Sequence, residues 1–285
     1  MRIAPRQRPI PPEIACKSCG SGNLVRFGSY KGVQRYRCVS CGSTFMGKNT
    51  LPHMKMPIEV VADAVSMFYE GLSLNAIRRQ LIQTYDIYPS GSNVYLWVVR
   101  FTKQAVKAGK GFTGKVGDTW VADETMLKIG GQKVWFWDCI DDRTRFLLSS
   151  HLTTGRFTRD AQILMERAAR RANKTPKKVI TDKLAAYIDG IERAFGAYTK
   201  HVQSKGFEVQ PNTNLIERFH STLKARSRVM RGMQNMETAR LILDGWLIHY
   251  NFFRPHEALG NRTPGEVAKV GFPFANWREV VIGGK

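Results

Sequence analysis

Three acidic residues of this chain have the chemistry and the spacing of a metal-dependent phosphoryl-transfer site. Asp123 and Asp182 each end an apolar segment, and Glu217 follows after the intervening residues 183–216. A phosphodiester resists attack because its anionic oxygens repel the nucleophile, and two Mg²⁺ ions about 4 Å apart activate the attacking oxygen and stabilise the leaving one. Such hard cations prefer carboxylate oxygens as ligands. If the three carboxylates converge as metal ligands, they form a site that cuts and joins nucleic acid.

The elements expected around these residues would bring the two aspartates together. Asp123 lies within a first strand and Asp182 at the end of a fourth, so adjacent parallel strands would place them side by side. Glu124 is expected to point to the opposite face of its strand. The element order is that of an RNase H-like fold, an α/β domain with a mixed sheet flanked by helices. The predicted strands are residues 119–127, 134–140, 145–152, 178–182 and a short one near 207–209, with a helix before the fourth strand, a helix over 184–195 and a long helix from about residue 213.

The last of these helices would carry Glu217 on the same face as basic residues. At 100° per residue, His220, Lys224 and Arg228 all project within about 60° of Glu217, whereas apolar side chains occupy the opposite face. We predict that Lys224 and Arg228 contact DNA phosphates. His220 is assigned to the same DNA-contacting face, with a place beside the metal or in helix packing as the alternatives.

The charge balance of the whole chain favours a polyanionic partner. The 285 residues include 44 Lys and Arg against 23 Asp and Glu, a net charge of +21 with a pI near 10.1. Such a balance is typical of proteins that bind nucleic acid, and we predict DNA as the partner. No apolar run approaches the ~18 residues of a membrane-spanning helix, and the basic N-terminus lacks the apolar core of a secretory signal. We therefore expect a cytoplasmic, nucleoid-associated protein with no membrane partner.

Four cysteines near the N-terminus have the spacing of a zinc ribbon. Cys16 and Cys19 form one Cys-x₂-Cys pair, Cys38 and Cys41 form a second, and 18 residues (20–37) separate the pairs. We predict that the four thiolates bind a structural Zn²⁺, without which this segment would fold poorly. A reduced thiol cluster without metal, and a ribbon that is structural or docks protein, are the alternatives. The strands expected between the pairs are residues 24–30 and 33–37.

Residues 51–112 are predicted to form the three helices of a helix-turn-helix domain. Apolar residues recur at helical spacing in three segments, which Gly71 and the Tyr85–Gly91 turn separate. The middle helix is basic and carries Arg78 and Arg79, which we predict to contact DNA. The recognition helix is either the third or the second, and a bundle without a nucleic-acid role is the alternative.

The predicted domains are a zinc ribbon (1–50), the helix-turn-helix domain (51–112) and a catalytic domain (113–272), with a C-terminal tail of residues 273–285.

The acidic residues and a C-terminal motif together resemble the DDE transposases of prokaryotic insertion sequences, in the group related to retroviral integrases. The resemblance covers about residues 113–270, and it includes Lys224 seven residues after Glu217. An N-terminal zinc ribbon with a helix-turn-helix fits some members of the group. The motif is Tyr250-Asn251-x-x-Arg254-Pro255-His256-x-x-Leu259, followed by Thr263-Pro264.

The resemblance implies that water cleaves the donor strand and that the freed 3′-OH then attacks target DNA. Mg²⁺ or Mn²⁺ would be held by Asp123, Asp182 and Glu217, and Lys224 would contact the DNA end. Two transposon ends must be joined in one complex, so we expect a homodimer or higher oligomer on DNA. Asn214 stands where some relatives have an arginine, so no DNA contact is assigned there. The C-terminal motif is interpreted as packing of the last helix on the core. A domesticated DNA-binding regulator and an RNase H-like nuclease without strand transfer are the alternatives.

Overall fold

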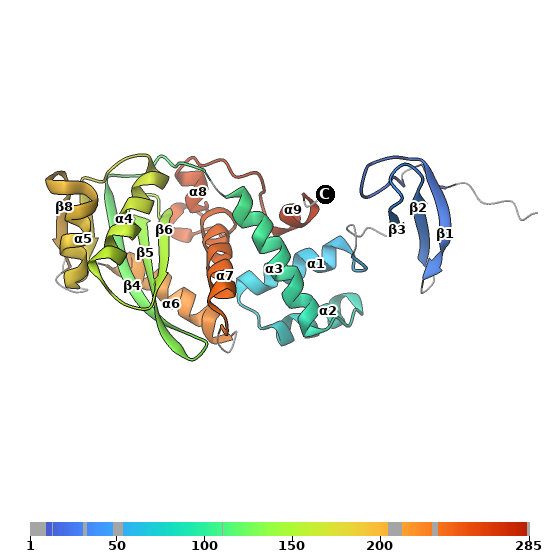
Figure 1. Cartoon of the computed structure of the whole chain (residues 1–285), viewed down its shortest axis with the longest axis horizontal. Coiled ribbons are helices and arrows are strands. Elements are labelled where there is room, and N and C mark those ends of the chain that lie inside the picture. The colour runs from blue at the N-terminus through green and yellow to red at the C-terminus, as the bar shows by residue number, and fades with distance from the viewer. Residues whose placement is uncertain are drawn as a thin grey trace, which may run out of the picture.

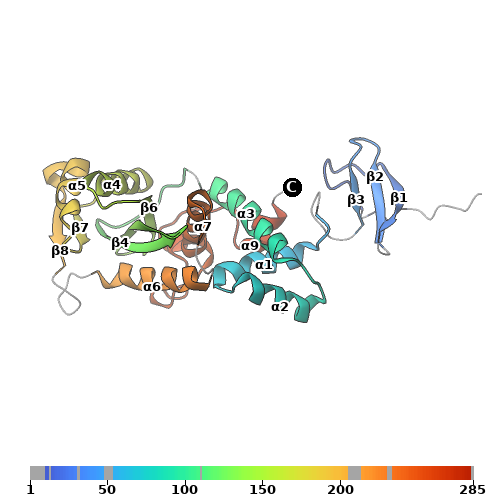
Figure 2. The same cartoon turned by 60° about the horizontal axis from the view of Figure 1, so that its bottom comes forward.

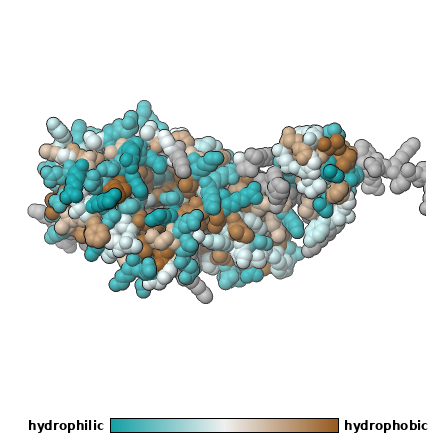
Figure 3. All heavy atoms as spheres, in the orientation of Figure 1, coloured by the Kyte–Doolittle hydropathy of each residue, from teal (hydrophilic) through white to brown (hydrophobic). Residues whose placement is uncertain are grey.

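The computed structural model describes residues 10–12, 14–30, 33–47, 54–109, 111–204, 213–229 and 233–283. A small β-sheet unit lies at one end, a group of helices in the middle and a larger α/β part at the other end (Figure 1). In the space-filling view of Figure 3, hydrophilic residues are spread over most of the α/β part, and apolar residues appear in small separate patches. None of the helices in the described residues is long and apolar enough to cross a membrane.

The N-terminal unit is an antiparallel sheet with a very small core. Its strands are β1 (Leu24–Tyr30), β2 (Val33–Cys38) and β3 (Thr44–Met46). The first two confirm the predicted strands, β3 was not predicted, and the predicted turn at Lys31 and Gly32 lies outside the described residues. Leu24, Tyr36 and Phe45 pack with Cys16 and Cys38 in a cluster separate from the main core. Because so few apolar side chains do not stabilise a fold by themselves, this unit needs an additional cross-link.

Three helices follow, and polar residues or glycine set their ends as the sequence predicts. They are α1 (Ile58–Glu70), α2 (Leu74–Tyr85) and α3 (Gly91–Ala108). Gly71 ends α1 with a φ of 104°, a left-handed conformation that glycine adopts without strain. Ser73 and Ser90 cap α2 and α3, since each hydroxyl accepts a hydrogen bond from a backbone N–H three residues on, at 3.1 Å.

The larger sheet has the strand order β6-β5-β4-β7-β8. β7 is parallel to β4 and β8 to β7, and the other pairs are antiparallel. Counted in chain order this is 3-2-1-4-5, the arrangement of an RNase H-like sheet, which confirms the predicted fold class. The fifth strand of the sheet is β8 (Lys200–Gln203), which was not predicted. The strand predicted near residues 207–209 falls outside the described residues. The strands are β4 (Thr119–Ile129), β5 (Gln132–Asp141), β6 (Leu147–Thr153), β7 (Lys178–Thr181) and β8 (Lys200–Gln203).

Helices cover both faces of this sheet (Figure 2). α4 (Thr158–Ala172) and α5 (Ala185–Phe195) lie on one face and α6 (Asn214–Val229) on the other, whereas α7 (Met236–Ile248) packs against α3. α4 and α5 approach each other closely at Gly190, where an added Cβ would lie 2.6 Å from that of Ala161. A larger residue at this position would push the two helices apart.

The C-terminal segments join the helical group and the α/β part into one core. The ring of Trp277 on α9 stacks on Tyr69 of α1, with 4.5 Å between the ring centroids. Buried residues of both parts form a single hydrophobic cluster. Residues 273–285, predicted as a tail, therefore contribute a helix that packs against α1 and α3. The segments after α7 are η2 (His249–Phe253), η3 (Glu257–Leu259), α8 (Pro264–Val267) and α9 (Trp277–Ile282).

Candidate active site

The two predicted aspartates meet where the sheet opens. β7 pairs with β4 only along Thr119–Val121 and ends at Thr181. β4 runs on beyond this pairing, so Asp123 lies past the last residue paired with β7, and Asp182 follows directly after that strand. Carboxylate oxygens of the two residues lie within 4.8 Å of each other, and both residues are half-buried. The parallel pairing of β4 and β7 thus brings them together.

Glu124 joins this pair, although alternation along the strand predicted that it would point away. One of its carboxylate oxygens lies within 4.8 Å of those of Asp123 and Asp182. Its side chain is 3% exposed. Burial, and then the charges of Asp182 and Asp123, raise the pKa of Glu124 to about 7, and burial also raises the pKa of Asp182. The cluster concentrates negative charge in a partly buried place, which is the electrostatic setting of a cation site.

His220 ties α6 to the sheet through two aspartates. Its Nε2 lies 2.9 Å from Oδ2 of Asp138 on β5, and its Nδ1 lies 3.4 Å from Oδ2 of Asp123. Asp138 is fully buried and His220 is 5% exposed. Although burial lowers it, the contacts with Asp123 and Asp138 raise the pKa of His220 to about 9, and burial raises the pKa of Asp138 to about 6. A cationic imidazole therefore lies between two carboxylates at neutral pH.

This position differs from the predicted DNA contact of His220. The helix projection grouped it with exposed basic residues, but the buried Asp138 accepts its Nε2–H and leaves the ring inside the interface between α6 and the sheet. The contact with Asp123 means that His220 orients a carboxylate of the cluster. The surroundings of His220 therefore match both alternatives to a DNA contact: it packs between α6 and the sheet, and it lies beside a predicted metal ligand.

Glu217 lies one helical turn before His220, a rise of about 4.5 Å. Its Oε1 accepts a hydrogen bond from the hydroxyl of Thr213 at 2.8 Å. Within the described part of the chain the 4.8 Å cluster comprises the other three carboxylates, so Glu217 is outside it. Because His220 contacts Asp123, the same helix places Glu217 beside the cluster rather than within it.

The C-terminal motif supports α6 from behind. The ring of Tyr250 packs edge-on against Phe219 of α6 at 5.1 Å and against His256 at 4.7 Å. Asn251 both accepts from and donates to the backbone of Leu147 on β6, at 2.9 and 3.0 Å. These contacts agree with the interpretation of the motif as core packing, and they fix the helix that carries Glu217.

The cluster fits a hard divalent cation such as Mg²⁺ or Mn²⁺. All its donors are carboxylate oxygens, the ligand type that these cations prefer. Oε2 of Glu124 is buried and has no hydrogen-bond partner among the described residues. A buried oxygen without a partner is costly unless a cation or a proton satisfies it. Asp123, Glu124 and Asp182 can therefore hold such an ion, with Glu217 nearby.

The predicted DNA-contacting residues occupy different surroundings. Lys224 and Arg228 are exposed on α6, and Arg79 is exposed on α2. Arg78 is half-buried, and its Nε donates to the carbonyl of Pro89 at 2.8 Å. Arg78 thus holds the turn that leads into α3, whereas the other three present their charges to solvent.

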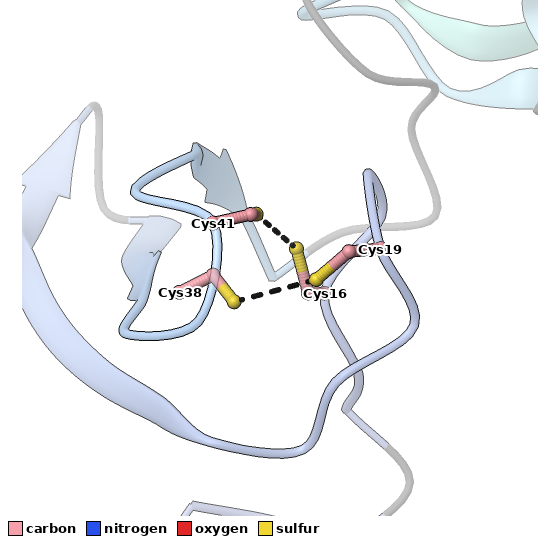
Figure 4. Close-up of side chains that lie close together, drawn as sticks. All are labelled: Cys16, Cys19, Cys38 and Cys41. Carbon is pink, nitrogen blue, oxygen red and sulfur yellow. Dashed lines mark hydrogen bonds between the residues drawn. The ribbon is translucent and has the colours of Figure 1, made fainter.

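The four N-terminal cysteines converge from two turns (Figure 4). Sγ of Cys16 lies 3.5 Å from that of Cys41, and Sγ of Cys19 lies 3.6 Å from that of Cys38. A disulfide would need about 2.05 Å, whereas four sulfurs around one Zn²⁺ at about 2.3 Å stand about 3.8 Å apart. Hydrogen bonds from Ser43 lower the pKa of Cys41 to about 6. Although a hydrogen bond from the backbone of Ser21 lowers it, the neighbouring cysteines raise the pKa of Cys19 to about 12, so Cys41 forms the thiolate that binds metal more readily than Cys19 does. The geometry fits a four-cysteine zinc site.

Comparison with known proteins identifies the α/β part. Residues 117–256 match the family model of the IS240 type of transposase, described as a DDE domain. A relative from Halobacterium salinarum, an uncharacterized protein in transposable element ISH50, is 33% identical over 92 residues. That alignment covers 32% of this chain and 30% of the relative, so the chain matches about a third of the relative's length.

Comparison with solved structures matches two retroviral proteins. The integrase catalytic core domain of HTLV-2 in complex with magnesium matches with a TM-score of 0.44 and 16% identity, over 54% of this chain and 99% of that one. The catalytic core domain of BIV integrase matches with a TM-score of 0.41 and 18% identity, over 54% of this chain and 94% of that one.

Proposed function

We propose that this chain binds transposon ends, cleaves the donor strand and joins the freed 3′-OH to target DNA. By its residues 117–256 it belongs to the DDE transposases of insertion sequences. The observation that carries the proposal is the meeting of Asp123 and Asp182 at the open edge of the sheet, beside a helix that presents Glu217. These are the groups that a metal-dependent phosphoryl transfer requires.

We propose that Asp123, Asp182 and Glu217 hold two Mg²⁺ or Mn²⁺ ions. Bound cations would activate the attacking oxygen and offset the charge that develops on the leaving oxygen. The chain itself supplies the ligands and their placement. His220 holds the carboxylate of Asp123 and anchors α6 through Asp138, so Glu217 stays beside the two aspartates.

DNA is the partner that the charge of the chain supports. A net charge of +21 attracts a polyanion over the whole surface. We propose that Lys224 and Arg228 extend from the site along exposed positions of α6 to contact the DNA end. The zinc ribbon (1–50) and the helix-turn-helix domain (51–112), with Arg79 exposed on α2, would recognise the end sequence. A homodimer or higher oligomer would hold two ends.

The test is a strand-transfer assay with the full chain, a labelled candidate transposon end, a target plasmid and Mg²⁺. We expect a joined product from the wild type and its loss in Asp182→Asn. Asp189→Asn is the matched control, because Asp189 is an exposed acid on α5, away from the cluster, and it should behave as wild type. Hydrolysis without joining would favour a nuclease, and a mobility shift without chemistry would favour a DNA-binding regulator. Full joining by Asp182→Asn would refute the site.

A further inference from the structure

Glu124 is a buried carboxylate whose surroundings do not satisfy it. Its side chain is 3% exposed, and Oε2 has no hydrogen-bond partner among the residues that the structure describes. Oε1 accepts from a guanidinium nitrogen of Arg156 at 3.2 Å. Tyr187 interacts with Glu124, but its buried hydroxyl likewise has no hydrogen-bond partner among the described residues. A carboxylate in such a place is expected to have every oxygen paired, so one acceptor position is left for a ligand.

The free oxygen belongs to a carboxylate that lies inside the acidic cluster. Glu124 comes within 4.8 Å of Asp123 and Asp182, although it neighbours Asp123 in the strand. Consecutive side chains of a fully paired strand would leave on opposite faces. β4 has already passed its last pairing with β7, at Val121, and at such an edge side chains from both faces can reach the same point.

Three charged carboxylates around Glu124 would need a further cation, or a bound proton, to balance them. Three carboxylates lie within 4.8 Å of one another. Against them stand His220, which is shared between Asp123 and Asp138, and Arg156. The Arg156 side chain is 42% exposed, and its guanidinium stacks on Trp135 at 4.1 Å. An exposed arginine offsets a buried carboxylate only weakly, because water screens its charge.

We propose that Glu124 is a fourth carboxylate ligand of the divalent-cation site, and that Arg156 is the cation that holds it when no metal is bound. This deepens the proposed function, because it rests on the same site. Mg²⁺ commonly takes only one or two carboxylates from the protein, so four carboxylates match a site for two ions. Glu124 and Asp182 then bind from either side of the gap between β4 and β7.

The test measures Mn²⁺ binding directly, with isothermal titration calorimetry on the zinc-loaded full chain. Removing a group that supports a bound metal costs about 10–100-fold in affinity, so Glu124→Gln should weaken Mn²⁺ binding at least about tenfold. Glu192→Gln is the matched control, since Glu192 is exposed on α5, and its affinity should equal that of the wild type. Arg156→Gln should bind Mn²⁺ as tightly as the wild type or more tightly, because a competing cation has been removed.

Three results would overturn the inference: no Mn²⁺ binding by the wild type, unchanged binding by Glu124→Gln, or a loss in Arg156→Gln as large as in Glu124→Gln. The last would mean that the Glu124–Arg156 pair matters only for structure. If Glu124→Gln fails to fold, Glu124→Asp decides, because it keeps the charge but shortens the reach. Several-fold weaker binding by that variant supports the inference, and unchanged binding overturns it.

The DNA-joining assay is independent: a wild type that binds Mn²⁺ through Glu124 but joins no DNA refutes the proposed function alone.

Discussion

Replacement of His220 by leucine separates the stability of the α6 interface from the chemistry of the site. The variant leaves Asp138 fully buried without its charge partner, and breaking a buried pair in this way costs about 3–5 kcal/mol. The variant does not avoid this loss by protonating Asp138. Adding a proton at pH 7 to a carboxylate with an ordinary pKa of about 3.9 costs about 1.4 kcal/mol for each pH unit above that pKa, or about 4 kcal/mol. For the part of the chain outside the zinc ribbon, residues 54–283, this loss predicts a melting midpoint roughly 6–20 °C below that of the wild type.

The pH dependence of this loss has a definite sign. Without His220 the pKa of Asp138 should rise beyond the value of about 6 that burial already gives it. The folded variant would then bind a proton that the unfolded chain releases above pH 4, so it gains stability as the pH falls, relative to a variant that lacks both His220 and Asp138. Thermal denaturation at pH 7 and pH 5 should therefore show a smaller difference at pH 5 between His220→Leu and the double variant His220→Leu with Asp138→Leu.

A second substitution and a control complete the experiment. Adding Asp138→Leu to His220→Leu removes the stranded charge, so most of the lost stability should return. DNA joining should stay impaired in the double variant, because Asp123 has lost the contact that orients it. Lys224→Leu, at an exposed position one turn further along α6, should change stability by no more than about 0.5 kcal/mol. A midpoint for His220→Leu within 2 °C of wild type, or a double variant no more stable than the single one, would refute the reasoning.

Three further predictions concern the ribbon, the helix packing and the DNA track. Chelation of zinc, or Cys38→Ser, should make residues 14–47 sensitive to protease while the melting of residues 54–283 stays unchanged, because the two cores are separate. Gly190→Ala should destabilise the chain by about 1–3 kcal/mol in thermal denaturation, because its Cβ would meet that of Ala161 at 2.6 Å; no change would show that α4 and α5 separate freely. The double variant Lys224→Gln and Arg228→Gln should weaken DNA binding and reduce the slope of log K against log salt by about 2, and an unchanged slope would place the DNA elsewhere.

Local signals in the sequence were enough to predict most of the fold. Gly71 marked the end of the first helix, and the apolar runs marked the strands, because end signals and periodicity act over a few residues. α9 was missed, although Trp277, Val280 and Val281 have helical spacing and are buried. A six-residue helix is marginal by itself, even with its N-cap Asn276, and its packing against α1 and α3 supplies the further stabilisation.

The site was less predictable, because two of its residues depend on long-range partners. Glu124 was expected to point away because alternation puts it on the opposite face of β4 from Asp123. The pairing with β7 ends at Val121, however, and at this open edge carboxylates from both faces come within 4.8 Å of one another. The helix projection grouped His220 with Lys224 because it considers only residues of the same helix, and Asp138, the partner of His220, lies on β5. A signal did exist: an aspartate inside an apolar strand needs a cationic partner when buried, and His220 is the residue that meets it.

The position of α6 connects the helical group with the acidic cluster. Its first half carries Glu217 and His220, and near its other end Arg226 lies 3.6 Å from Glu70, the last residue of α1. Glu70 also contacts His249 at 3.2 Å, and a side chain at Gly71 would collide with Arg226. A 16-residue helix is about 24 Å long and stiff, so a shift of its last turns at this contact would also move the first turns, which carry Glu217. Under the proposed function, DNA held by the helical group would therefore bear on the placement of Glu217 beside the acidic cluster.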